Sequence, residues 1–482
     1  MEFLPTIGLE IHAELKTKTK MFCPSPNDPD EKRPNVNICP ICMGHPGTLP
    51  TINKEAVKHI IAVGKAVGGE IADFTQFERK HYFYPDIPKG YQISQYRYPI
   101  VRGGILCGVL ITRVHLEEDT ARSTHDRDDE SSLVDFNRAG IPLMELVTEP
   151  VIKSAKEAGD FARELQLTLR YLGVSEANME KGEMRVEANI SVAPEGSSIG
   201  PTLEGSRGTK VEVKNLNSFR VVEKAIEYEI KRQSETLLGG GKIVQETRGW
   251  NEKTGKTFSQ RSKEESHDYR YFPEPDLPPM RLSLVPEFQN LELPELPREK
   301  RERYRKDYGI KDEDIESFVV NVELGGFFER VMRDLGQDAE AIKLASNYIT
   351  SDIVGILKTE LYGISPERIG KLDASDFADM VVMARKGELS SRGMKDILPT
   401  VMREEMTARE IAQRMNVFQK SDEGELKKIA ESVIGANEKV VAEYRAGKEQ
   451  SLQFLVGQAM KESKGSANPQ ILKNLLEELL RT

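Results

Sequence analysis

The sequence has few cysteines and no long apolar run. Its 482 residues contain four cysteines, too few for a disulfide framework in a chain of this length. No run of about 18 apolar residues occurs, so we expect no membrane-spanning segment. Strand-like sequence begins by Ile7, which leaves no room for a signal or transit peptide. These absences predict a cytoplasmic protein.

Several familiar functional motifs are also absent. The sequence has no Gly-x-x-x-x-Gly-Lys-Ser/Thr loop, no Gly-x-Gly-x-x-Gly after a strand and no Gly-x-Ser-x-Gly elbow. If ATP binds, it uses neither a P-loop nor a Rossmann turn. The net charge of −10 argues against a protein coated for nonspecific nucleic-acid binding, although it leaves room for a local RNA site.

The chain is too long for a single hydrophobic core. Alternating strand patterns at 7–12, about 109–116, 184–192 and 209–214 lie among helical patterns at about 53–68, 154–172 and 219–237. The strands are polar on one face, which predicts an α+β domain over residues 1–293 with a largely antiparallel sheet.

The region from about 265 to 297 contains seven prolines, which exclude a regular helix or a central strand there. After Leu296 the periodicity is helical, and Pro297 is placed as at a helix start. We therefore predict an all-α domain over 294–406 and a small helical tail domain over 407–482.

Glu10 and His12 form the first candidate site. Ile7, Leu9 and Ile11 alternate with polar residues, so Glu10 and His12 project from one strand face, about 7 Å apart. A carboxylate and an imidazole in this arrangement are half of a metal site. The alternative is an amphipathic strand whose polar face meets water.

A second acidic cluster ends the apolar strand at 109–116, where Glu117 and Glu118 follow His115 and Leu116. Two carboxylates about 5 Å apart repel by about 3 kcal/mol at an effective dielectric of 20. If the sheet gathers them with Glu10, a cation is needed, and carboxylate oxygens favour Mg²⁺ shared with nucleotide phosphates. The alternative is a solvated strand end.

Two further strands carry charge on one face. Arg185 and Glu187 alternate with apolar residues in the first, and Glu212 and Lys214 do so in the second. Either face could meet solvent, but several such strands favour a cradle with a charged floor, in which arginine binds phosphate oxygens.

The cysteines suggest a second kind of metal site. Cys39-Pro-Ile-Cys42, with Cys23 upstream, resembles half of a zinc ribbon, but Ser25 stands where another cysteine would complete the set. The alternative is three reduced thiols. Cys107 stands alone in an apolar strand, and we expect it to serve packing.

Two segments could contact RNA. Residues 79–95 read as an aromatic loop with Lys89 and Tyr91, and aromatics beside cations stack bases and hold phosphates. The alternative is a loop packed over the sheet edge. In the tail, Lys461 and Lys464 lie about one helical turn apart, where they could meet RNA backbone or be plain surface.

These motifs together resemble the family formed by the B subunit of the glutamyl/aspartyl-tRNA amidotransferase. The resemblance covers essentially the whole chain in order, in the stretches IGLEIH (7–12), YFYPDIPKGYQISQ (82–95), HLEED (115–119), VDFNRAGIPLMELVTEP (134–150), YLGVSEANMEKGEMRVEANIS (171–191), KNLNSFR (214–220), DYRYFPEPDLPP (268–279) and LVGQAMKESKGSANP (455–469).

The resemblance implies a cradle similar in fold to glutamine synthetase and guanidino kinases. It implies ATP and Mg²⁺, an amidase subunit that makes ammonia from glutamine, and a small third subunit, in a heterotrimer. The implied reaction is phosphorylation of the side-chain carboxylate of Glu or Asp misacylated on tRNA, followed by amidation to Gln-tRNA or Asn-tRNA.

The resemblance also implies roles for individual residues. Glu10, His12 and the Glu117/Glu118 pair would form the metal and ATP centre, with Glu187 and Glu212 as weaker candidates. Phosphate or transition-state charge would fall to Arg185, Lys214 and Arg220. Lys89 and Tyr91 would meet the substrate or the tRNA acceptor end.

Two departures from the family pattern stand out. Zinc-bearing members have Cys-x-Cys where this chain has Cys23-Pro24-Ser25, which puts zinc in doubt. Many members have Asn where this chain has His81. Two other functions compete with the implied one: a noncatalytic tRNA-binding scaffold, and a stand-alone ligase of the glutamine synthetase type, against which the helical tail argues.

Overall fold

The computed structural model describes residues 3–125, 131–195, 208–262, 269–359, 372–419, 423–463 and 467–481. The chain divides into two compact units, Met1–Pro297 and Arg298–Thr482. The first unit is mixed α and β with a mainly antiparallel sheet, and the second is helical, as predicted. The division into three domains, at residues 293 and 406, stays a prediction.

A ten-stranded sheet forms the centre of the first unit, in the order β15-β14-β13-β12-β1-β11-β8-β6-β2, with β7 paired to β8. Neighbouring strands are antiparallel except β13 and β14. The strands are β1 (Phe3–Glu14), β2 (Glu70–Ile71), β6 (Val101–Arg102), β7 (Ile105–Leu106), β8 (Val109–Glu118), β11 (Pro142–Thr148), β12 (Met184–Pro194), β13 (Val211–Leu216), β14 (Glu246–Asn251) and β15 (Lys256–Ser262).

Three small sheets complete the strand inventory of the described chain. They pair β9 (Arg122–His125) with β10 (Ser132–Asp135), β3 (Phe74–Thr75) with β17 (Met280–Arg281), and β16 (Phe272–Pro273) with β4 (Glu78–His81) and β5 (Tyr91–Ser94). The segment 79–95 is therefore a hairpin rather than a loop throughout, and it pairs with the proline-rich segment near residue 272.

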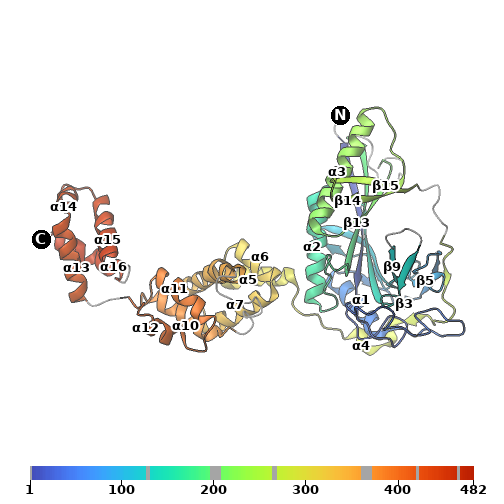
Figure 1. Ribbon diagram of the computed structural model, residues 1–482, viewed down its shortest axis with the longest axis horizontal. Helices are drawn as coiled ribbons and strands as arrows, with labels where there is room; N and C mark the ends of the chain where they lie inside the picture. Colours follow the sequence, from blue (N-terminus) through green and yellow to red (C-terminus); the bar gives the residue numbers. More distant parts are fainter. Residues whose placement is uncertain are drawn as a thin grey trace. The chain divides into compact units, whose positions relative to one another are not determined.

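Helices cover the apolar face of the large sheet. They are α1 (Lys54–Ala66), α2 (Ala155–Tyr171) and α3 (Phe219–Leu238), and α2 and α3 pack side by side (Figure 1). Each starts at a side-chain cap, from Asn53, Ser154 and Ser218. The short helix α4 (Pro286–Gln289) and a 3₁₀ turn at Leu282–Leu284 follow in the proline-rich segment.

The alternation of β1 separates the two faces of the sheet. Ile7, Leu9 and Ile11 are at most 1% exposed in the core beneath the helices. Each contributes about 1.5–3 kcal/mol by burial. Glu10 and His12 therefore project from the opposite face, as their spacing predicted.

The second unit consists of helices α5 (Pro297–Tyr308), α6 (Asp312–Val320), α7 (Val322–Leu335), α8 (Ala339–Asn347), a π-helix (Tyr348–Ile353), α9 (Val354–Lys358), α10 (Ala374–Arg385), α11 (Ser391–Val401), α12 (Ala408–Arg414), α13 (Glu423–Ala436), α14 (Glu438–Arg445), α15 (Gln450–Glu462) and α16 (Pro469–Arg481). Stacked Phe318 and Phe328 centre one part of its core, and Leu426, Leu455 and Leu476 belong to another apolar cluster. Lys461 lies in the last turn of α15, whereas Lys464 lies outside the described residues.

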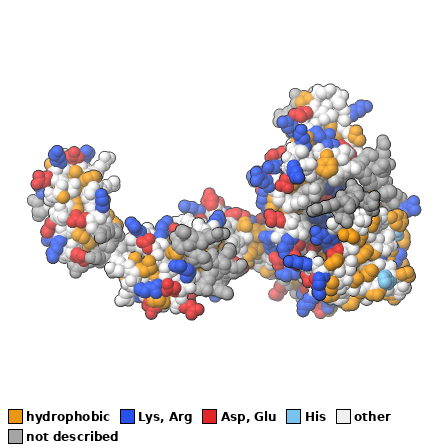
Figure 2. All heavy atoms as spheres, in the orientation of Figure 1, with side chains coloured by type: hydrophobic (Ala, Val, Ile, Leu, Met, Phe, Trp, Pro, Cys, Tyr) orange, Lys and Arg blue, Asp and Glu red, His pale blue; other side chains and the backbone are white. Residues whose placement is uncertain are grey.

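Basic and acidic side chains are interspersed over both units in the view of Figure 2. In the described part of the chain, no helix is both long enough and apolar enough to cross a membrane.

The expectation that Cys107 serves packing is wrong. Cys107 is exposed, and its φ is +48°. It lies with Gly108 in the tight turn that joins β7 to β8, and not within a strand, as its apolar neighbours had suggested. Side chains in such a two-residue turn point into solvent.

Two adjacent glycines in α7, Gly325 and Gly326, give a test of how closely this helix packs against the chain at Phe318. A Cβ at Gly325 would lie 2.4 Å from the Phe318 carbonyl oxygen, whereas at Gly326 the nearest neighbour would be an Arg330 nitrogen at 3.9 Å. Gly→Ala in a helix usually stabilises by about 1 kcal/mol, but overpacking costs about 1–3 kcal/mol. We expect Gly325→Ala to lower the free energy of unfolding by about 1–3 kcal/mol. Gly326→Ala should leave it unchanged or higher, and equal stabilities in urea titrations of the two variants would contradict this packing.

Candidate active site

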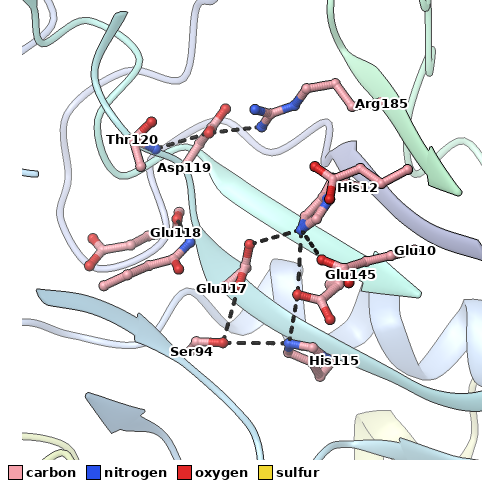
Figure 3. Close-up of polar contacts among 12 residues, drawn as sticks. Glu10, His12, Ser94, His115, Glu117, Glu118, Asp119, Thr120, Glu145 and Arg185 are labelled. Atoms are coloured by element: carbon pink, nitrogen blue, oxygen red, sulfur yellow. Dashed lines mark hydrogen bonds and ion pairs between the residues drawn. The ribbon is translucent and has the colours of Figure 1, made fainter. Parts of the chain in front are cut away.

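Cross-strand register brings the charged residues of four strands into one row on the open face of the sheet. His12 on β1 lies opposite Glu145 on β11 and opposite Arg185 on β12. Glu145 in turn lies opposite His115 on β8. Side chains that face one another across antiparallel strands are close enough to interact, so the register itself builds the site (Figure 3).

His12 lies at the centre of this row. Its Nε2 is 3.4 Å from Glu117 Oε1, 3.4 Å from Glu145 Oε2 and 3.8 Å from Glu10 Oε1. Ser94 Oγ, on β5, donates to Glu117 Oε2 over 3.1 Å. The Glu117 and Glu145 side chains are only 3% and 6% exposed, so their charges are little screened by water.

A second group of carboxylates adjoins the first through Glu10. Glu10 lies directly opposite Glu187, and ligand atoms of Glu10, Glu187 and Glu212 lie within 4.8 Å of one another. Lys214 Nζ is 2.8 Å from Glu187 and 3.5 Å from Glu212. The structure thus brings together the predicted residues of β1, β12 and β13.

The electrostatics of the cluster show where charge is left unbalanced. Burial, and then repulsion from Glu145 and Glu187, raises the pKa of Glu10 to about 7. Burial opposes the charged form of His12, but hydrogen bonds to Glu117 and Glu145 raise its pKa above the usual range. The neighbouring carboxylates therefore favour the charged form of His12, whereas burial and like charge both disfavour the charged form of Glu10.

The donor set fits hard divalent cations. Three overlapping groups, each with ligand atoms within 4.8 Å, share Glu10 and Glu145: Glu10, His12 and Glu145; His115, Glu117 and Glu145; Glu10, Glu187 and Glu212. Carboxylate oxygens with one imidazole suit Mg²⁺ or Mn²⁺. Such a cation would relieve the repulsion that raises the pKa of Glu10.

The structure shows which of Glu117 and Glu118 joins the cluster, a choice that the sequence left open. Because β8 continues to Glu118, the two side chains point to opposite sides, and only Glu117 joins His12. Glu118 accepts from the Ile93 backbone N–H and pairs with Lys89 at 2.7 Å. Tyr91 lies beneath the Arg79 guanidinium at 4.2 Å. Lys89 and Tyr91 thus lie at Glu118 and not among the clustered ligands.

Arg185 is held at the edge of the cluster by Asp119, whose Oδ1 is 3.0 Å from its Nη2. Arg138 contacts the other Asp119 oxygen at 2.6 Å and Glu14 at 2.8 Å. Burial works against ionised Asp119, but the two guanidinium groups lower the pKa of Asp119. Arg185 is therefore fixed by one carboxylate at the rim of the cluster, where the rest of its guanidinium can meet an anion.

Arg220 lies elsewhere. It lines a pocket of about 540 Å³ formed by α3 and the β14–β15 hairpin, together with Lys224 and Trp250. The helix α3 packs on the apolar face of the sheet, so the chain that leaves β13 carries Arg220 away from the carboxylates of the opposite face.

The three predicted thiols do gather. The sulfur atoms of Cys23, Cys39 and Cys42 lie within 4.8 Å of one another. Cys42 Sγ is 3.9 Å from Ser25 Oγ and 3.8 Å from Nζ of the buried Lys20. A hydrogen bond from Cys23 lowers the pKa of Cys42 to about 4, with burial opposing and Lys20 assisting. Only three thiols meet where structural zinc takes four ligands, so zinc stays a prediction.

Sequence reasoning missed Glu145, which links two of the carboxylate groups. A signal was available: Glu145 is the single charge in the apolar run Pro142–Thr148, and a charge in a buried strand requires a partner. Lys80 and Arg113 were also missed. Arg113 contacts Glu145 at 3.1 Å. Burial disfavours the charged form of Lys80, but the carboxylates of Glu117 and Glu145 favour it and raise the pKa of Lys80. Both cations thus neutralise the cluster from neighbouring strands.

Comparison with known proteins covers nearly the whole chain. A family model described as the GatB/GatE catalytic domain matches residues 5–285, and one described as the GatB domain matches residues 327–480. The chain is 43% identical to the B subunit of the aspartyl/glutamyl-tRNA(Asn/Gln) amidotransferase of Persephonella marina, over 100% of both chains. It is 43% identical to that of Dehalococcoides mccartyi strain 195, over 99% of each, and 41% identical to that of Thermotoga maritima, over 100% of this chain and 99% of the other.

A pair of variants on β11 and its end tests the cluster as a cation site. Glu145→Gln removes a charge shared by two ligand groups, and we expect Mn²⁺ affinity to fall at least about tenfold. Glu149→Gln, four residues on, changes a carboxylate outside these groups that accepts from Thr112 at 2.8 Å, and should bind Mn²⁺ normally. Titration of the full chain followed by electron paramagnetic resonance measures both, and equal affinities would contradict the assignment.

Proposed function

The chain belongs to the B-subunit family of the aspartyl/glutamyl-tRNA(Asn/Gln) amidotransferases, and from this membership we propose that it activates misacylated tRNA for amidation. The substrates are ATP and a tRNA that carries Glu or Asp in place of Gln or Asn. The products are Gln-tRNA(Gln) or Asn-tRNA(Asn), ADP and phosphate. We further propose that the cradle is related in fold to glutamine synthetase and the guanidino kinases.

One observation carries the proposal: a buried set of carboxylates that the chain does not neutralise by itself. Glu10, with its pKa raised to about 7, faces Glu187 across the strands and lies near Glu145. Like charges placed directly opposite destabilise a sheet, so their retention favours a functional cation site.

Glu10, His12, Glu117 and Glu145 would hold Mg²⁺, with Glu187 and Glu212 at its side. Bound Mg²⁺ would offset the charge of the ATP phosphates and of the phosphoryl group in transfer. His12 would have to give up its proton to become a ligand.

The cations at the rim of the cluster suit the phosphates themselves. Lys214 bridges Glu187 and Glu212, and its half-exposed ammonium can turn to a phosphate once a cation occupies those carboxylates. Arg185, oriented by Asp119, presents its guanidinium from the other side. Lys89, which pairs with Glu118 apart from the clustered carboxylates, lies in the connection between β4 and β5 and would meet the substrate.

The chemistry explains why these groups are needed. A carboxylate is a poor acyl electrophile, so its oxygen attacks the γ-phosphorus of ATP, the bond to the β–γ bridging oxygen breaks and ADP leaves. Ammonia then adds to the acyl carbon, the bond between that carbon and the phosphate oxygen breaks, and phosphate leaves with the amide formed. Positioning and charge neutralisation supply the catalysis, and excluding water protects the acyl phosphate.

The proposal requires partners. An amidase subunit would supply ammonia from glutamine, and a small third subunit would complete the heterotrimer. The helical second unit, with Lys461 near the end of α15, would bind the tRNA. Zinc at Cys23, Cys39 and Cys42 is a separate proposal, which metal analysis of the purified chain decides.

Glu10→Gln tests the catalytic role. In the complex reconstituted with its partner subunits, we expect ATP-dependent, glutamine-driven amidation of Glu-tRNA and Asp-tRNA to fall at least about a hundredfold. Binding of tRNA should persist, because the substituted carboxylate lies in the sheet of the first unit. Glu149→Gln is the matched control and should remain active.

The competing function, a noncatalytic tRNA scaffold, has the opposite signature. In that case Glu10→Gln is silent, and deletion of residues 407–482 abolishes function. A stand-alone ligase would instead turn over ATP with free glutamate and no tRNA.

A further inference from the structure

Five tyrosines from three separate segments form one continuous series of ring contacts, here called the tyrosine chain. Its members, in spatial order, are Tyr84, Tyr82, Tyr269, Tyr271 and Tyr96. Successive ring centroids are 6.2, 5.9, 6.2 and 4.8 Å apart, and the last pair is nearly parallel, at 14°. Residues from the β4–β5 hairpin, from the end of β5 and from the segment before β16 thus meet in one aromatic surface.

Much of this surface faces solvent. Tyr84, Tyr96 and Tyr269 are 53%, 52% and 41% exposed. Within the described chain, the hydroxyl groups of these three and of Tyr271 have no hydrogen-bond partner. Hydrophobic side chains, a class that includes tyrosine in Figure 2, gather over the part of the unit where Figure 1 labels β3 and β5. Exposed contiguous aromatic surface usually marks a binding site.

The tyrosine chain is continuous with the carboxylate cluster. The Arg113 guanidinium lies 5.6 Å from the Tyr96 ring centroid and contacts Glu145 at 3.1 Å. Burial, and then the carboxylates of Glu145 and Glu117, raise the pKa of Tyr271 against the opposing effect of Lys80. A ligand that stacks on these rings therefore has one end at the catalytic carboxylates.

Cations are interleaved with the rings. Lys80 Nζ is 5.2 Å from the Tyr269 ring centroid and 5.9 Å from that of Tyr82, and it makes no ion pair with any described residue. Arg97 follows Tyr96 in the chain and is half-exposed, with Glu78 3.6 Å away. Aromatic faces that alternate with Lys and Arg are the arrangement that binds single-stranded nucleic acid, by stacking bases and neutralising phosphates.

We propose that the tyrosine chain is the platform on which the unpaired 3′-terminal bases of the tRNA stack, so that the esterified amino acid enters the carboxylate cluster. The inference rests on the proposed function and names the residues that would position its substrate. Tyr96, beside Arg113, and Tyr271, stacked on it, would receive the terminal adenosine. Tyr269, Tyr82 and Tyr84 would receive the bases before it.

Two other occupants fit less well. The adenine of ATP would occupy a single ring, whereas the tyrosine chain extends over five rings in contact. A partner protein would be expected to bury an apolar core, whereas this surface, within the described chain, carries hydroxyl groups without hydrogen-bond partners and an ammonium group without an ion pair.

The test uses the reconstituted complex and an uncharged tRNA whose terminal adenosine is replaced by 2-aminopurine, a base whose fluorescence is quenched by stacking. We expect quenching with the unaltered complex, loss of most of it with Tyr96→Ala and retention with Tyr96→Phe. The half-exposed Tyr96 side chain can be removed without opening a cavity in the core. Phe258→Ala, which removes a half-exposed aromatic from β15, is the matched control and should quench normally.

Kinetics separate the possible ligands. Tyr96→Ala should raise KM for the aminoacylated tRNA about tenfold or more, without change in KM for ATP. A rise in KM for ATP alone would assign the surface to adenine, and loss of assembly with the partner subunits would assign it to protein docking. Either result overturns the proposal, as does unchanged quenching in Tyr96→Ala.

Failure of the proposed function would appear differently. A complex that quenches 2-aminopurine through Tyr96 but amidates no tRNA would leave the platform standing and refute the reaction. A complex that amidates tRNA with equal KM in the unaltered protein and Tyr96→Ala would refute the platform alone.

Discussion

The contact of His12 with Glu117 and Glu145 sets the strictest requirement on this structure. It joins three strands, because His12 is on β1, Glu145 on β11 and Glu117 on β8. A shift of one residue in any of these pairings would turn the side chains of that strand to the helix-covered face. Burial of Ile7, Leu9 and Ile11 under the helices prevents such a shift. The hydrophobic core therefore holds the polar face in register.

The polar face of the sheet brings like charges together, which lowers the stability of the fold. Glu10 and Glu187 lie directly opposite each other, and Glu145 is buried nearby. His12, Lys214, Arg113 and Lys80 offset part of the charge, but burial, and then the proximity of Glu145 and Glu187, still raises the pKa of Glu10. Buried carboxylates without full compensation indicate a site organised around a ligand that brings positive charge.

Much of this arrangement could be predicted from periodicity. The alternation in 7–12, 184–192 and 209–214 placed Glu10, His12, Glu187, Glu212 and Lys214 on one face, and the structure has them there. Long-range pairing could not be predicted this way. Alternation within a strand does not say that His12 faces Glu145, some 130 residues on, or that the chain after β13 carries Arg220 to another pocket. The prediction grouped Glu118 with Glu117 because they are adjacent in sequence. Their side chains point to opposite faces because β8 continues as far as Glu118, which the sequence pattern did not indicate.

The position of β1 in the sheet has a consequence for folding. Although it comes early in the chain, β1 lies between β11 and β12, so both of its hydrogen-bonding edges are satisfied by strands that begin at Pro142 and Met184. At about 5–20 residues per second, a ribosome needs roughly 10–40 s to deliver β12 after β1. Until β11 is made, this twelve-residue strand, which is rich in apolar residues, lacks both partners, and one edge stays open until β12 is made. Assembly of the sheet is consequently a late, long-range event, and β1 has an unpaired edge until β12 has been synthesised.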